Sequence, residues 1–245
     1  MNLKNIVYHL AHPGITWAKI RYYSKDTLGF RSYSQFGEDV MLRGFFLGDK
    51  WSWKPYHGFW VDIGAHHPTR QSNTKFYSKA GWRGINVDAS TDAIQLFNRQ
   101  RKRDINVNVG IGKTEGNLDY FRMSSPLLNT FSKAFADKAI AAGDASLIES
   151  VKVPVITLKT LLDKYLPSGQ EIDFMSIDCE GLDLEILESN DWNLYRPEYI
   201  LIEIHMGGEN WEVQSTPAAR FLKEHGYELV GQCICTSLFK RVRDR

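Results

Sequence analysis

Residues 59–68 read Phe-Trp-Val-Asp-Ile-Gly-Ala-His-His-Pro, a short apolar run that ends in a polar turn. The run is typical of a buried strand, and Gly64 permits a tight turn directly after it. Ala65 leaves the backbone open to a close ligand, and Asp62 offers a carboxylate that can accept a hydrogen bond from an ammonium group. An Asp-x-Gly turn also occurs in many unrelated loops, so its meaning depends on the rest of the chain.

Short apolar runs and helical patterns alternate around this stretch. The runs are 58–63, 84–88, 105–111, 172–177 and 199–204, and the helical patterns are 35–46, 73–80, 91–101, 158–166 and 182–188. Residues 227–231 and 233–240 are predicted to form a hairpin that closes the sheet. The alternation predicts a Rossmann-like α/β fold, with a mostly parallel seven-stranded sheet and helices on both faces.

A second carboxylate ends the next predicted strand, in Gly-Ile-Asn-Val-Asp-Ala (84–89). A carboxylate at this position commonly binds the two hydroxyls of a ribose, so Asp88 and the adjoining Ala89 are predicted to contact a nucleoside. Asp88 can also cap the helix that begins near Thr91, and the two roles are compatible. Asp62 and Asp88 are 26 residues apart, the length of one β-α-β unit.

The glycine pattern separates two classes of cofactor. The turn has one glycine followed by two histidines, and the chain lacks both the Gly-x-Gly-x-x-Gly fingerprint and the Gly-x-x-x-x-Gly-Lys-[Ser/Thr] loop. A ligand with a ribose and an amino acid tail but no phosphate fits better than NAD. The sequence therefore favours S-adenosylmethionine.

Six motifs, in this order, resemble those of FkbM family methyltransferases. They are Tyr-Ser-Gln-Phe-Gly-Glu-Asp-Val (33–40), Asp-Ile-Gly-Ala-His-His-Pro (62–68), Ser-Asn-Thr (72–74), Gly-Trp-Arg-Gly-Ile-Asn-Val-Asp (81–88), Ile-Asp-Cys-Glu-Gly (177–181) and Ile-Glu-Ile-His (202–205). The resemblance implies a class I methyltransferase fold, S-adenosylmethionine as donor, and O-methylation of sugars or polyketide-type products. It assigns Asp62, Gly64 and Ala65 to the methionine end of the cofactor, Asp88 to the ribose, Asn73 to the same pocket and Asp104 to the adenine amino group. Asn73 can instead simply cap the next helix.

Four titratable groups follow two predicted strands that should be neighbours: Asp178, Glu180, Glu203 and His205. A sugar hydroxyl needs a general base or a metal ion before it can accept a methyl group. In one mechanism His205 takes the proton and Glu203 or Asp178 orients it. In the other, Asp178 and Glu203 hold a divalent cation such as Mg²⁺ that binds the substrate diol, and His205 is still the base. The metal-free version is favoured, and Glu180 is equally well explained as an acid at a helix start.

The chain is predicted to divide into an N-terminal arm (1–33) and a methyltransferase domain (34–245), with a lid or substrate-binding insertion at about 112–150. The arm mixes apolar and basic residues. This pattern allows contact with a membrane surface or a neighbouring subunit, although packing against the chain's own core is favoured.

Composition limits the partners. The chain has 43% hydrophobic residues and a net charge of +1, which argues against nucleic acid. The basic runs 99–103 and 240–245 are interpreted as solvated. Three cysteines without metal-ligand spacing indicate a reducing compartment, and no apolar segment resembles a signal peptide or a membrane span, so a cytoplasmic location is expected.

The predicted function is S-adenosylmethionine-dependent O-methylation of a sugar, glycan or related polar metabolite. The alternatives are an NAD-dependent oxidoreductase and a non-catalytic cofactor-binding scaffold. The acceptor and the oligomeric state stay open. Sugar stacking would be indicated by four aromatic residues if they were exposed: Trp51, Trp53, Tyr56 and Trp60. For His66 and His67, a structural role is favoured.

Overall fold

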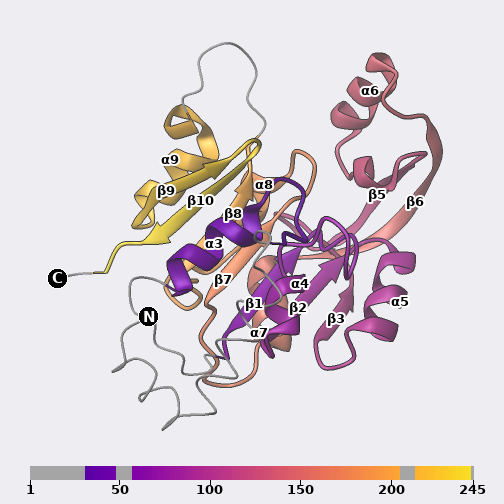
Figure 1. The fold of residues 1–245 in the computed structure, drawn as a ribbon. Coiled ribbons are helices and arrows are strands. Elements are labelled where there is room, and N and C mark those ends of the chain that lie inside the picture. Colours follow the sequence, from indigo (N-terminus) through magenta and orange to yellow (C-terminus); the bar gives the residue numbers. More distant parts are fainter. Residues whose placement is uncertain (1–30, 48–56, 205–212, 244–245) are drawn as a thin grey trace, which may run out of the picture.

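The computed structural model describes residues 31–47, 57–204 and 213–243. A sheet of seven strands in the order β3-β2-β1-β7-β8-β10-β9 forms its centre (Figure 1). The strands are β1 (Phe59–Ile63), β2 (Arg83–Asp88), β3 (Ile105–Asn108), β7 (Phe174–Ile177), β8 (Tyr199–Glu203), β9 (Tyr227–Cys233) and β10 (Thr236–Arg241). Only β10 runs antiparallel to its neighbours β8 and β9. The predicted Rossmann-like fold and mostly parallel seven-stranded sheet are confirmed.

Helices cover both faces of this sheet. On one face, α3 (Glu38–Leu47) and α4 (Lys75–Lys79) pack with Trp60 in a cluster of buried aromatic and aliphatic side chains. On the other face, α7 (Leu158–Tyr165), α8 (Asp183–Glu188) and α9 (Pro217–Glu224) pack with Val61. Adjacent residues of β1 thus point to opposite faces, as a strand requires. The sequence patterns did not predict α9.

A smaller sheet in the order β4-β6-β5 accounts for most of the predicted insertion. It consists of β4 (Gly110–Ile111), β5 (Gly116–Met123) and β6 (Leu147–Ile156), with a 3₁₀ turn (Pro126–Leu128) and α6 (Lys133–Ala142) between β5 and β6. Figure 1 shows this unit beside the large sheet, above α5 (Thr91–Gln100). The predicted single strand at 105–111 is therefore wrong. Its first half pairs with β2, and its end pairs with β6 in the second sheet.

Two further observations concern the surface. The side chain of Trp60 is fully buried, so it cannot stack on a sugar; the three aromatic residues at 51, 53 and 56 lie outside the described residues.

Within the described part of the chain, no helix combines the length and apolar character that crossing a membrane demands. The N-terminal arm lies outside this part, except for its last three residues.

Candidate active site

The candidate site is a cleft of about 1080 Å³ at the carboxyl ends of the parallel strands. The strand order turns back between β1 and β7, and ligands of open α/β sheets bind at such a point. The large sheet contributes Gly64, Asp88, Ala89, Asp178, Glu180 and Glu203 to the lining. Three aromatic residues of the insertion line it as well: Tyr120 in β5, Phe131 in the segment before α6, and Phe135 in α6. The insertion therefore forms a wall of the cleft, and its role as a lid remains a prediction.

Gly64 forms the turn after β1, and no other residue fits there. Its φ is +77°, and a Cβ at this position would lie 1.9 Å from the carbonyl oxygen of Asp178. The Gly64 and Ala65 N–H groups both donate to the carbonyl oxygen of Val87 in β2, at 3.0 Å each. The turn thus joins the tips of β1, β2 and β7. Ala65 is buried beneath it and does not line the cleft.

Asp88 ends β2 and reaches the cleft with a fixed carboxylate. One of its oxygens accepts from the His66 N–H at 2.8 Å, and the other accepts from the Ser90 N–H at 2.7 Å. Burial raises its pKa to about 6, although these two hydrogen bonds oppose the shift. Each carboxylate oxygen has a second lone pair, so the group can still accept from the two hydroxyls of a ribose.

Asp62 and Asn73 lie behind the cleft and not in its lining. Asp62 is buried, and its carboxylate accepts from the Thr74 hydroxyl at 3.1 Å. Desolvation raises its pKa to about 6, against the opposing charge of Arg101. Asn73 donates to the Ser176 hydroxyl in β7 at 3.1 Å. Both residues tie the loop after β1 to the sheet, and their predicted contacts with a bound cofactor stay predictions.

Asp104 is not brought to the cleft. Its carboxylate lies 2.6 Å from the Arg101 guanidinium, and both side chains are almost completely buried. Arg101 also donates to the Thr74 hydroxyl and the Pro68 carbonyl oxygen, and it lies over the ring of Trp60. The interpretation of run 99–103 as solvated is therefore wrong for Arg101. The buried ion pair gives no support to the predicted contact between Asp104 and an adenine.

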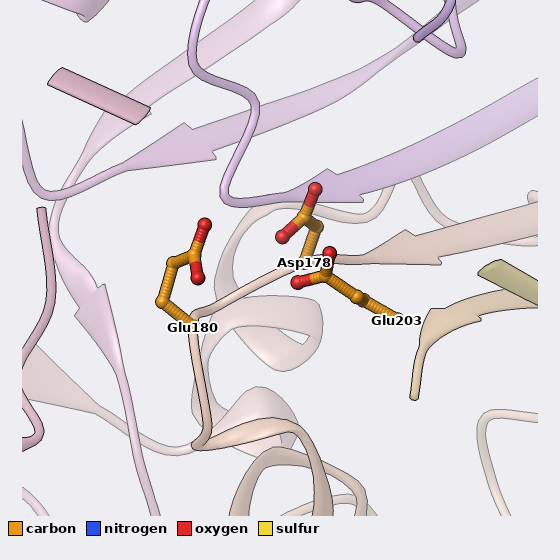
Figure 2. Close-up of side chains that lie close together, drawn as sticks. All are labelled: Asp178, Glu180 and Glu203. Carbon is orange, nitrogen blue, oxygen red and sulfur yellow. The ribbon is translucent and has the colours of Figure 1, made fainter. Parts of the chain in front are cut away.

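Three carboxylates converge at the tips of β7 and β8. Oxygen atoms of Asp178, Glu180 and Glu203 all lie within 4.8 Å of one another, and Figure 2 shows their side chains turned toward a common space. Asp178 and Glu203 lie close enough for their carboxyl groups to hydrogen-bond when one of them is protonated. Desolvation and, next, the charge of Glu203 raise the pKa of Asp178 well above its usual range. The raised pKa favours protonation of this cluster relative to an isolated carboxylate, and its oxygen ligands also suit a hard cation.

The loop that carries Asp178 and Glu180 depends on two residues that the sequence analysis did not assign to the site. Asp183 accepts from the Cys179 N–H at 3.1 Å and the Gly181 N–H at 3.3 Å. The Thr130 hydroxyl, from the insertion, donates to the Glu180 carbonyl oxygen at 3.1 Å. Glu180 itself has a φ of +49°, which is costly for a residue with a side chain. These contacts hold the strained loop in place.

The histidines have different outcomes. His205 lies outside the described residues, so its predicted role as a base stays a prediction. The Nδ1 of His67 accepts from the N–H groups of Thr69 and Arg70, each at 3.1 Å, which is the expected structural role, and His67 also lines the cleft. His66 lines the cleft, and burial lowers its pKa.

Known proteins show similarity to this chain in its sequence and its fold. A methyltransferase FkbM domain matches residues 62–229. One similar solved structure is a methyltransferase FkbM from Methylobacillus flagellatus KT, with 12% identity and a TM-score of 0.39 over 75% of this chain and 43% of that one. Another is a TehB-like SAM-dependent methyltransferase from Corynebacterium glutamicum ATCC 13032, with 10% identity and a TM-score of 0.40 over 95% of this chain and 99% of that one.

The chain thus spans less than half the length of the first of these structures. Among curated proteins, none matches it. The domain match covers well over half of the 245 residues and includes the tips of β1, β2, β7 and β8. The chain belongs to the FkbM methyltransferase family.

Proposed function

We propose that this protein is an S-adenosylmethionine-dependent O-methyltransferase that acts on a hydroxyl of a sugar or a related polar metabolite. The observation that carries the proposal is the placement of two sets of carboxylates in one cleft. Asp88 lies on one side of the Gly64 turn, and the Asp178–Glu203 pair lies on the other. Family membership supports methyl transfer, and the two sets of carboxylates support a cleft with a cofactor-binding side and an acceptor-binding side.

The donor side of the cleft suits an adenosyl ligand without phosphates. Asp88 is positioned to accept from ribose hydroxyls, and the apolar side chains of Leu96 in α5 and Val109 after β3 also line the cleft. The N–H groups of Gly64 and Ala65 are used within the sheet, so this turn has no free amide pair to bind a pyrophosphate. When bound, the sulfonium of S-adenosylmethionine supplies an activated methyl group.

The acceptor side must orient a hydroxyl and remove its proton. The two neighbouring carboxyl groups favour a state in which one is protonated, and the ionised partner can then accept a hydrogen bond from the substrate and afterwards its proton. A carboxyl group with a raised pKa is a better base than an ordinary one at neutral pH, because its affinity for the proton is higher. His205 follows β8 by two residues and is a second candidate for this role.

A binding experiment separates this proposal from its rivals. In calorimetric titrations we expect S-adenosylmethionine and S-adenosylhomocysteine to bind, and NAD to show no heat of binding. Transfer of a labelled methyl group to a panel of sugars then tests catalysis. Binding of NAD in preference to S-adenosylmethionine would support an oxidoreductase, and cofactor binding without transfer to any acceptor would support the scaffold.

A further inference from the structure

The segment before α3 is hydrogen-bonded at its two ends to the loop after β1 and to the end of β9. We call residues 33–37 the strap. At one end, the Ser72 N–H donates to the Tyr33 carbonyl oxygen at 2.8 Å. At the other end, the Cys233 thiol donates to the Phe36 carbonyl oxygen at 2.7 Å. Ser72 follows β1, Cys233 ends β9, and β7, β8 and β10 lie between these strands in the sheet. The strap thus spans this edge of the sheet, and it lines the same cleft as Asp178 and Glu203.

Two buried acids fix the shape of the strap. Glu38 is 2% exposed and accepts from the Phe36 N–H at 2.8 Å. Asp39 is fully buried and accepts from the Tyr33 N–H at 3.1 Å and the Ser34 hydroxyl at 2.9 Å. Burying a carboxylate is costly unless polar partners compensate it, and here strap donors do so together with Thr236 for Glu38 and Arg43 for Asp39. These contacts tie the strap to the start of α3.

The strap presents two side chains to the cleft. Gln35 and Phe36 both line it, together with Glu203 and Cys235. Phe36 is 39% exposed, although it is a large apolar residue, and Gln35 is exposed beside it. An aromatic ring can pack against the apolar face of a sugar ring, and an amide offers both a donor and an acceptor to its hydroxyls. Ligand sites commonly combine such an apolar surface with a few polar groups.

We propose that the strap is the acceptor-binding element, in which Phe36 packs on a hydroxylated ring and Gln35 hydrogen-bonds its hydroxyls beside the Asp178–Glu203 pair. The inference rests on the proposed function, because it takes the ring that binds here to be the methyl acceptor. It deepens that function by assigning acceptor binding to residues of the family-like motif at 33–40, which precedes the matched domain at 62–229.

The test measures acceptor binding separately from methyl transfer. Saturation-transfer NMR is recorded on the protein saturated with S-adenosylhomocysteine, with the methyl glycosides of glucose, galactose, mannose and rhamnose as probes. We expect at least one glycoside to bind the wild type, and Gln35→Ala or Phe36→Ala to weaken it by about tenfold. Phe36→Trp keeps a ring and should stay within about threefold of the wild type.

Two matched variants control for general damage. Phe45→Ala removes the same kind of side chain with nearly the same exposure, 36%, from α3 outside the cleft. Gln95→Ala removes an exposed amide from α5, also outside the cleft lining. Both should leave glycoside binding unchanged, and all variants should bind S-adenosylhomocysteine as the wild type does.

Three outcomes would overturn the inference: no glycoside binds the wild type, the strap variants bind as tightly as the wild type, or the control variants lose as much affinity. Methyl transfer in the same samples is assayed with labelled S-adenosylmethionine. Strap-dependent glycoside binding without any transfer would contradict the proposed function and would still support the strap as a glycoside-binding element.

Discussion

The backbone of Gly64 packs directly on the carbonyl oxygen of Asp178, so closely that a single added Cβ would lie 1.9 Å from that oxygen. This contact joins the turn on the donor side of the cleft to the first residue of the proposed acceptor side. The distance between the two halves of the site is therefore set by a backbone contact at the switch point of the sheet. A methyl transfer in line requires such a fixed separation, because misplacement of the reacting groups by about 1 Å costs roughly 100-fold in rate.

Gly64→Ala should disrupt this contact and the turn together. The substitution adds a steric overlap with backbone and forces a side chain into a φ of +77°, so we expect a loss of about 2–4 kcal/mol in the free energy of unfolding. Binding of S-adenosylhomocysteine should fall in parallel. Urea unfolding and calorimetric titration measure the two effects.

Gly44→Ala is the matched control for this variant. Gly44 lies in α3, where an added Cβ would meet nothing within 4 Å. Because alanine is the better helix former, the control should keep or raise stability, by up to about 1 kcal/mol. Equal behaviour of the two variants would contradict the importance of the turn.

Asp88 should make cofactor binding dependent on pH. Its pKa of about 6 lies above the ordinary value, and the proposed contact with ribose hydroxyls is strongest with the ionised carboxylate. Binding of S-adenosylhomocysteine should therefore be fully developed above pH 7 and weaken as the pH falls through 6, by about tenfold at pH 5. Calorimetric titrations at pH 5, 6, 7 and 8 measure this change.

The corresponding variant is Asp88→Asn. It removes the titrating group, so its affinity should be low at every pH and should lose the step near pH 6. A variant that keeps the wild-type pH profile would show that another group controls binding. Asp62, whose pKa is also raised to about 6, is the first alternative to examine.

The acceptor-side carboxylates should act without a metal ion. We expect Asp178→Asn and Glu203→Gln each to lower kcat by about 100-fold or more, because a general base contributes that much, while the affinity for S-adenosylhomocysteine changes little. Glu224→Gln, an exposed acid in α9 outside the cleft, should behave as the wild type. Incubation with EDTA should leave the rate unchanged. Loss of activity in EDTA and its recovery with Mg²⁺ would instead show that these carboxylates hold a cation.

The large sheet was predictable because its strands are locally apolar and separated by periodic helices. The small sheet was not. Most of β6 is exposed or half-buried, and its sequence, Leu-Ile-Glu-Ser-Val-Lys-Val-Pro-Val-Ile, lacks a continuous apolar run. Its pairing with β5 supplies the missing stability, and that pairing cannot be read from the strand itself. The boundary between β3 and β4 could not be predicted either, because it depends on the different strands with which each of them pairs.

Part of the candidate site was likewise predictable from the sequence, and part was not. The carboxylates at strand tips were predictable, since the carboxyl ends of parallel strands meet at one edge of a sheet. The strap was not predicted as part of the cleft, because its hydrogen bond from Cys233 to Phe36 joins residues 197 positions apart. Arg101 was misjudged because its burial depends on Trp60, which comes from another element.

Arg101 therefore provides a sharp test of the structure. Arg101→Ala should cost about 3–5 kcal/mol in the free energy of unfolding, because it leaves the buried carboxylate of Asp104 without its partner. The double variant Arg101→Ala with Asp104→Ala should recover part of this loss, since no unpaired charge remains at that position. Arg99→Ala, two residues away and exposed, should change stability by less than about 0.5 kcal/mol. If the Arg99 and Arg101 variants had equally small effects on the free energy of unfolding in urea, Arg101 would be solvated, and the buried ion pair with Asp104 would be contradicted.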